Sequence, residues 1–261
     1  MPNVDAHQPG TFCWVELATL DTAAAKRFYQ DLFGWTFVDH PMGEGDPYTI
    51  LQANGRDAAA LYKMRPEQQA QGVPPNWLLY VTAASADETT QQAGALGGTV
   101  LGPPFDVFDM GRMSVLQDPA GAVFALWQPN THKGIGIVNE PGAFCWAELM
   151  SKDIAKAKTF YTKLFGWNTE SMPMPEFEYT LFKLGEVPTG GGMAVPPGHD
   201  FIPSHWVPYF TVTDCDGTVA KAKAAGSTIH VPPTDVPNIG RFSTMADPQG
   251  AAFAILQPPP Q

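Results

Sequence analysis

Two short segments of the chain place a glutamate two positions after a tryptophan. PGTFCWVEL carries Trp14 and Glu16, and PGAFCWAEL, in the second half of the chain, carries Trp146 and Glu148. A glutamate can accept a hydrogen bond or take a proton as a general base, and an indole ring can stack on a flat ligand. Because residues two apart on a strand point the same way, we expect each tryptophan to share one surface with its glutamate.

A second pair of matching segments supplies further polar side chains. GRMSVLQDPAGAVFALWQP and GRFSTMADPQGAAFAILQP both carry a DPxG turn between two expected strands. Across the first turn we expect Ser114 opposite Ala125 and Arg112 opposite Trp127, on the same face as the glutamate. An earlier strand of each half adds a tyrosine to that face. The candidate site residues are therefore Trp14, Glu16, Tyr80, Arg112, Ser114, Trp146, Glu148, Tyr209, Arg241 and Ser243.

These residues also have a purely structural interpretation. Glu16 and Arg241 could form an ion pair at the centre of a sheet, because buried charges are normally paired. Trp14 and Trp146 could fill a core, where aromatic side chains are common. A pocket is favoured over a core if the surface that they share is open and concave.

The chain is an internal repeat. DTAAAKRFYQDLFGW, which starts at Asp21, matches DIAKAKTFYTKLFGW, which starts at Asp153. Asp21 is a suitable N-cap and Gly34 a suitable end for a helix between them. AsnGly at 54 and 55 and DPxG at 118–121 predict turns between strands. In the first half we expect strands at 12–17, 48–52, 57–63, 77–82, 112–117 and 122–128, and a second helix at 87–96.

The composition narrows the class of protein. Of the 261 residues, 44% are hydrophobic and 16% are charged, which favours a chain folded throughout. A net charge of -11 disfavours nucleic-acid binding. We find no apolar run of the roughly 20 residues of a membrane helix and no signal peptide, so we expect a cytoplasmic protein. Cys13 and Cys145 hold matching places and predict small buried thiols.

The strings FYxxLFGW and DPxG, at these places in both halves, resemble the vicinal oxygen chelate superfamily of glyoxalase I, extradiol dioxygenases and bleomycin-resistance proteins. The resemblance implies an α+β fold: a tandem duplication of glyoxalase-like domains, each with two βαβββ units that form curved mixed sheets, four units in total. Residues 1–129 would form the first domain, 130–140 the linker and 141–261 the second domain. Paired units of this family curl into a half-open cup, which the candidate residues would face.

The enzymes of this family hold a divalent metal in the cup, with ligands on the first and last strands of the units. None of the corresponding places here carries a donor that a metal could use. His205 is the nearest alternative ligand, but its counterpart in the first half is Asn76. We therefore expect no cofactor, because the ligand positions do not support a metal site. Those positions are Trp14, Leu78, Ala125, Trp146, Val207 and Ala254, and the remaining ones fall within 58–64 and 190–195, which contain no acid or histidine.

Two functions remain open at this point. The first is a binding protein that holds a small, aromatic or otherwise planar organic molecule, as the bleomycin-resistance branch does without metal. The alternative is a glyoxalase- or dioxygenase-like enzyme of lyase, isomerase or hydroxylase type, with Glu16 or Glu148 as the catalytic base. Such an enzyme would use a non-standard metal site or metal-free acid–base chemistry, with an arginine stabilising the anion.

The resemblance also leaves open how the cups are assembled. In many family members a cup is shared between two halves. A shared first cup would contain Trp14, Glu16, Tyr209, Arg241 and Ser243, and a shared second cup Trp146, Glu148, Tyr80, Arg112 and Ser114. The partners swap if each half closes on itself. We expect a monomer, because the two repeats can mimic the family dimer, with a small molecule as its partner and neither nucleic acid nor a membrane.

Overall fold

The computed structural model describes residues 3–43, 45–174 and 177–259. The first repeat contains β1 (Phe12–Thr19), α1 (Thr22–Phe33), β2 (Thr36–His40), β3 (Tyr48–Ala53), β4 (Arg56–Lys63), α2 (Pro66–Ala70), β5 (Asn76–Thr82), α3 (Ala86–Ala95), β6 (Thr99–Val107), β7 (Gly111–Gln117) and β8 (Val123–Pro129). The second repeat contains β9 (Phe144–Ser151), α4 (Ile154–Phe165), β10 (Asn168–Pro173), β11 (Glu178–Leu184), β12 (Val187–Ala194), β13 (His205–Thr211), α5 (Cys215–Ala224), β14 (Thr228–Val236), β15 (Gly240–Ala246) and β16 (Ala252–Gln257).

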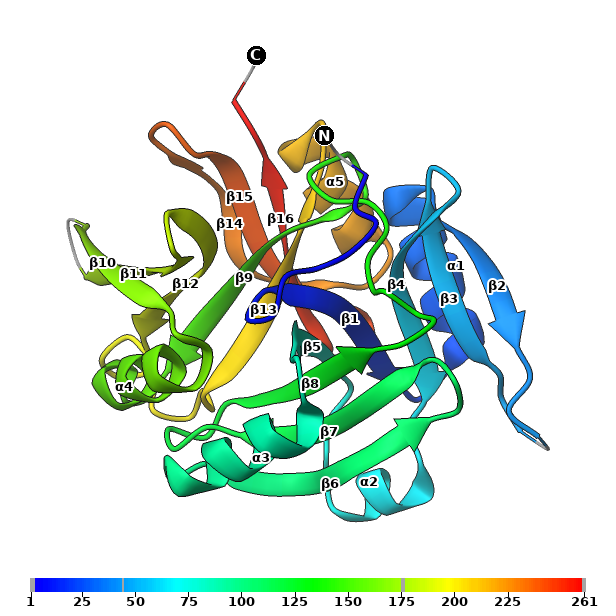
Figure 1. Ribbon diagram of the computed structural model, residues 1–261. Helices are drawn as coiled ribbons and strands as arrows, with labels where there is room; N and C mark the ends of the chain where they lie inside the picture. Colours follow the sequence, from blue (N-terminus) through cyan, green and yellow to red (C-terminus); the bar gives the residue numbers. More distant parts are fainter. Residues whose placement is uncertain (1–2, 44, 175–176, 260–261) are drawn as a thin grey trace.

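Each repeat forms one mixed, curved sheet of eight strands. The strand orders are β2-β3-β4-β1-β5-β8-β7-β6 and β10-β11-β12-β9-β13-β16-β15-β14. Strand β1 is parallel to β4 and antiparallel to β5, so the two βαβββ units of one repeat meet at the centre of its own sheet. The two sheets contact each other through β5 and β13, which lie in the middle of the molecule (Figure 1). The fold is therefore α+β, with two glyoxalase-like domains in tandem.

The two faces of each sheet have different surroundings. The alternate residues Val15, Leu17 and Leu79 are fully buried toward the helices and the other repeat. Trp14, Glu16 and Tyr80 lie on the opposite face of the first sheet, which we call the first cup. The equivalent face of the second sheet, with Trp146, Glu148 and Tyr209, is the second cup.

Helix α1 begins and ends where the sequence predicts. The Asp21 side chain accepts a hydrogen bond from the Ala24 N–H at 2.9 Å, and Gly34 ends the helix with a left-handed φ of 72°. Its aromatic residues pack across the repeat boundary, since the Phe33 ring centre lies 5.2 Å from that of Phe210. The FYxxLFGW strings are therefore packing and capping elements of the fold.

Reciprocal hydrogen bonds join the repeats. Trp35 Nε1 donates to the Gly142 carbonyl and Trp167 Nε1 donates to the Gly10 carbonyl, both at 2.7 Å. The Tyr29 hydroxyl also donates to the buried Asp247 carboxylate of the second DPxG turn, at 3.1 Å. Because these partners are buried, the interface contributes to the stability of both repeats. No helix among the described residues has the length and apolar character needed to cross a membrane.

Candidate functional site

A chain of hydrogen bonds holds the glutamate of the first cup. Trp14 Nε1 donates to the Tyr48 hydroxyl at 3.2 Å, and that hydroxyl donates to Glu16 Oε2 at 2.7 Å. From β5, the Tyr80 hydroxyl donates to Glu16 Oε1 at 3.0 Å. Each carboxylate oxygen thus accepts one phenolic O–H, and the indole orients one of the two phenols.

The second cup repeats this arrangement. Trp146 Nε1 donates to the Tyr179 hydroxyl at 2.9 Å, which donates to Glu148 Oε2 at 3.1 Å. The Tyr209 hydroxyl donates to Glu148 Oε1 at 2.7 Å. Since the same four residue types meet in both cups, we call this the Trp-Tyr-Glu-Tyr motif.

The surroundings of Glu16 and Glu148 raise the pKa of both side chains. Burial raises the pKa of Glu16 and of Glu148, and the two tyrosine hydrogen bonds oppose this shift in each case. Burial also raises the pKa of Tyr80 and Tyr209 well above the usual value, so these hydroxyls remain donors at neutral pH. Among the described residues, no lysine or arginine forms an ion pair with either glutamate. Each site is therefore a carboxyl group solvated mainly by two phenols.

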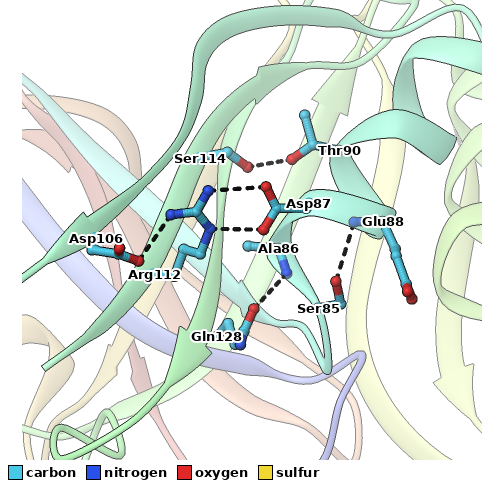
Figure 2. Close-up of polar contacts among 9 residues, drawn as sticks. All are labelled: Ser85, Ala86, Asp87, Glu88, Thr90, Asp106, Arg112, Ser114 and Gln128. Carbon is cyan, nitrogen blue, oxygen red and sulfur yellow. Dashed lines mark hydrogen bonds and ion pairs between the residues drawn. The ribbon is translucent and has the colours of Figure 1, made fainter. Parts of the chain in front are cut away.

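The predicted position of the arginines and serines in the cups is wrong. Arg112 donates to Asp87 of α3 at 2.7 Å and to Asp106 at 2.8 Å, on the helix side of the sheet (Figure 2). Ser114 lies on the same side, 2.7 Å from the Thr90 hydroxyl (Figure 2). In the structure Val115 and Met113, rather than these two residues, pair with the cup-facing residues of β8.

The second repeat shows the same difference from the prediction. Arg241 donates to Asp216 of α5 at 2.7 Å, and Ser243 donates to the Val231 carbonyl at 2.6 Å. Because Arg241 is bound there, the ion pair between Glu16 and Arg241, which was the alternative structural interpretation, does not form. The arginines are therefore unable to stabilise an anion beside either glutamate.

The alternative in which cups are shared between repeats is also wrong. Glu16 is bound by Tyr80 of its own repeat, and Glu148 by Tyr209 of its own repeat. The physical reason is the antiparallel pairing of β1 with β5 and of β9 with β13, which closes each sheet within one repeat. Of the predicted residues, the structure brings together Trp14, Glu16 and Tyr80, and their counterparts Trp146, Glu148 and Tyr209.

Sequence reasoning missed one tyrosine in each cup. Tyr48 and Tyr179 start matching segments, YTIL and YTLF, at the third strand of the repeats. Alignment of the two halves through these segments would have paired them.

The position that pairs with the glutamate on the next strand differs between the repeats, because Ala60 on β4 is replaced by Gly191 on β12. A β-carbon at Gly191 would collide with the Tyr179 hydroxyl, so the Tyr179 side chain can lie over β12 only because this residue is a glycine.

The donors in the cups do not fit a divalent metal. Metals of this kind take several carboxylate or imidazole ligands, whereas each glutamate is surrounded by neutral phenols. Across residues 3–43, 45–174 and 177–259, no three His, Cys, Asp or Glu side chains gather as ligands would. His205 lies on the face of the second cup, but its Nδ1 is 2.7 Å from the Pro203 carbonyl.

A separate hollow of about 550 Å³ lies near the start of α4, between Pro119 and Lys156. It contains neither glutamate and none of the tyrosines of the motif. The residues that could bind a ligand or transfer a proton are therefore those of the cup faces, and not those of this hollow.

The chain matches known proteins of similar sequence and a family model, and that family is the one that the fold indicates. A family model described as Glyoxalase/Bleomycin resistance protein/Dioxygenase superfamily matches residues 11–126 and 143–255. The chain belongs to this superfamily. A protein of Mycobacterium tuberculosis named "Putative glyoxylase CFP32" is 41% identical over 264 residues, which cover 100% of both chains. "Anthracycline biosynthesis protein DnrV" of Streptomyces peucetius is 32% identical over 261 residues, which cover 95% of this chain and 94% of that protein.

Solved structures share the architecture at low identity. A Mn(II)-bound glyoxalase from Novosphingobium aromaticivorans superposes with a TM-score of 0.66 at 17% identity, over 96% of this chain and 82% of that chain. A 2,2',3-trihydroxybiphenyl 1,2-dioxygenase from Sphingomonas wittichii gives a TM-score of 0.63 at 14% identity, over 96% of this chain and 91% of that chain. At these identities the likeness concerns the fold alone.

Proposed function

We propose that the protein binds a flat aromatic molecule that carries a hydrogen-bond donor, such as a phenolic hydroxyl or a protonated amine. The observation that carries this proposal is the glutamate of the Trp-Tyr-Glu-Tyr motif, which forms no ion pair with any lysine or arginine in the described part of the chain. A largely buried carboxyl held by only two phenols retains lone pairs for a third donor. A donor on the ligand would offset part of the cost of burying this group.

The neighbours of the glutamate support an aromatic ligand. In the second cup, Val207, Tyr209 and Ala254 form a small apolar cluster, against which Trp146 and Phe242 pack while remaining partly exposed. Aromatic and apolar side chains around a few fixed polar groups are typical of small-molecule sites. The relative named for anthracycline biosynthesis is consistent with a ligand of fused aromatic rings.

Titration calorimetry with two matched compounds tests this function. We expect 2,6-dihydroxyanthraquinone to bind at least tenfold more tightly than 2,6-dimethoxyanthraquinone, which has the same ring system and no donor. A hydrogen bond to a charged group contributes about 1.5 to 3 kcal/mol, which corresponds to roughly 10- to 150-fold in affinity. Equal affinities would refute the role of the glutamate, and binding of neither compound would refute the proposal for this ligand class.

A second function is favoured by the raised pKa of the glutamates. A carboxyl whose pKa is raised by burial is a better general base than an ordinary one, as in a metal-free isomerase or lyase, and the name of the mycobacterial relative suggests glyoxalase-type chemistry. The tyrosine hydroxyls, rather than the arginines, would stabilise the resulting anion. Loss of deuterium from the carbon beside a carbonyl group, followed by NMR with a deuterated 2-oxoaldehyde, would detect such proton transfer. The rate should fall to the buffer rate when both Glu16 and Glu148 are replaced by glutamine.

A further inference from the structure

The segment that joins the two repeats folds back over the first cup. The Asn130 N–H donates to the Met110 carbonyl at 2.9 Å, and the His132 N–H donates to the same carbonyl at 3.1 Å. Further along, the Ile135 N–H donates to the Cys13 carbonyl of β1 at 2.7 Å. The first half of the linker is thus tied to the repeat that carries Trp14 and Glu16.

The His132 side chain lies in the first cup. Its ring stands edge-on to Trp14, with 4.6 Å between ring centres and 85° between planes, and lies 5.9 Å from Trp127. Trp127 Nε1 donates to the His132 carbonyl at 3.0 Å and fixes this position. An aromatic pair at such a distance and angle is a favourable arrangement. The surface that Trp14 would offer to a ligand is therefore occupied by the chain itself.

The linker also joins the first cup to the main hydrophobic core. Ile135 is 1% exposed and Trp14 is 4% exposed, and both belong to the same cluster of buried residues as Tyr80. In the second cup, Tyr209 belongs instead to a small separate cluster, and Trp146 remains partly exposed. The two cups therefore have the same polar motif, but the tryptophan is buried in the first cup and partly exposed to solvent in the second.

The residue types explain why the second repeat does not copy this cover. Pro259 stands at the place of Asn130 when the matching strands β8 and β16 are aligned. Proline has no backbone N–H, so it is unable to form the bond that Asn130 makes to Met110. Ile239, the counterpart of Met110, is 49% exposed. The hydrogen bond with which the linker turns back over the first cup therefore has no equivalent at Pro259 in the second repeat.

We propose that the two cups have different roles: the second cup is the ligand site, and the first is closed by His132, which takes the place of the ligand. This inference rests on the proposed function and assigns it to one surface. By analogy with His132, one ring of a flat ligand packs against Trp146 and beside Leu256, the counterpart of Trp127. Its donor then reaches Glu148.

Calorimetry on the whole chain with 2,6-dihydroxyanthraquinone tests the assignment. We expect one bound molecule per chain, an affinity at least tenfold weaker in Trp146→Ala, and an unchanged affinity in Trp14→Ala. Because Trp14 is buried and its alanine variant can fail to fold, Trp14→Phe and Trp146→Phe provide a second matched pair. Two equivalent sites in the wild type, or loss of binding on replacement of Trp14, would overturn the assignment while the proposed function stands. No binding by the wild type would overturn the proposed function itself.

His132→Gly tests the occupied state of the first cup. Removal of the imidazole should uncover the face of Trp14, so we expect a second bound molecule per chain in this variant. That second site should disappear again in the double variant His132→Gly with Glu16→Gln, whose first cup lacks the carboxylate. A folded His132→Gly protein that still binds one molecule would show that His132 does not hold the place of a ligand.

Discussion

Replacement of Glu148 by glutamine separates a binding role of this residue from a structural one. In the wild type two phenols donate to the carboxylate, at 3.1 Å from Tyr179 and at 2.7 Å from Tyr209. Hydrogen bonds to a charged group contribute about 1.5 to 3 kcal/mol and neutral ones about 0.5 to 1.5, so the two bonds together lose about 2 to 3 kcal/mol. The same change removes the cost of burying a carboxylate, which is evident in the raised pKa of Glu148.

These two effects oppose each other, so we expect the free energy of unfolding of Glu148→Gln to change by less than about 2 kcal/mol. Urea denaturation measures this change, with an unaltered dependence on urea concentration as evidence of an intact fold. The ligand donor would meet a neutral amide oxygen instead of a carboxylate. A loss of about 1 to 2 kcal/mol in that bond weakens the binding of 2,6-dihydroxyanthraquinone by roughly 5- to 30-fold.

Glu16→Gln is the matched control, because the same motif is covered by the linker in the first cup. Its affinity for the ligand should equal that of the wild type, with a similarly small change in stability. A stability loss of about 3 kcal/mol or more in either variant would indicate a charged partner left unpaired, and the structure contains none for these glutamates among its described residues. Unchanged affinity in Glu148→Gln would refute the role of this carboxylate in binding.

Three further predictions follow from the same geometry. Tyr29→Phe removes the hydrogen-bond partner of the Trp77 N–H and of Asp247 Oδ2, while Asp247 Oδ1 keeps its bonds from the Gln249 and Ala251 N–H groups. Urea denaturation should therefore show a loss of about 2 to 6 kcal/mol, from about 1 to 3 kcal/mol for each buried group. Gly191→Ala should displace the Tyr179 hydroxyl and weaken ligand binding in calorimetry, while a gain in affinity would contradict the placement. A raised pKa for Glu148 means that its folded form holds a proton more tightly than the unfolded chain. Its stabilising contribution is therefore present below pH 4.5 and lost as the pH rises through the folded pKa, a dependence that should be missing from Glu148→Gln denaturation curves.

The sequence predicts those elements that carry a clear local signal. Strand β1 is predicted from its aromatic and β-branched residues, although in the structure every residue of the strand except Glu16 is buried. Helix α1 is predicted from Asp21 and Gly34, which cap it in the structure. No bounds were predicted for β2, because all its residues are exposed and no alternation marks it. Strand β6 contains Pro103 and Pro104 and has register shifts beside them. Because prolines are rare inside strands, the sequence of this segment is typical of a loop and did not predict a strand.

A single residue in a turn explains why the polar part of the site was predicted on the wrong face. A four-residue DPxG turn places Arg112 and Ser114 toward the cup. In the structure Asp118 pairs instead with Ala122, because its carboxylate accepts the backbone N–H groups of both Ala120 and Ala122. The loop is thus one residue longer, and a shift of one residue turns every side chain of a strand to its other face.

The same shift changes the chemistry that the cups can perform. With Arg112 and Arg241 in the cups, each glutamate would have a cationic partner, and anionic ligands would be attracted. With the arginines bound to Asp87 and Asp216 on the helix side, neither glutamate forms an ion pair with an arginine or lysine among residues 3–43, 45–174 and 177–259. A buried carboxyl without a counter-ion favours a ligand that supplies a donor or a positive charge. The proposed preference for phenols or amines over anions therefore depends on the length of two turns and not on the residues of the cup alone.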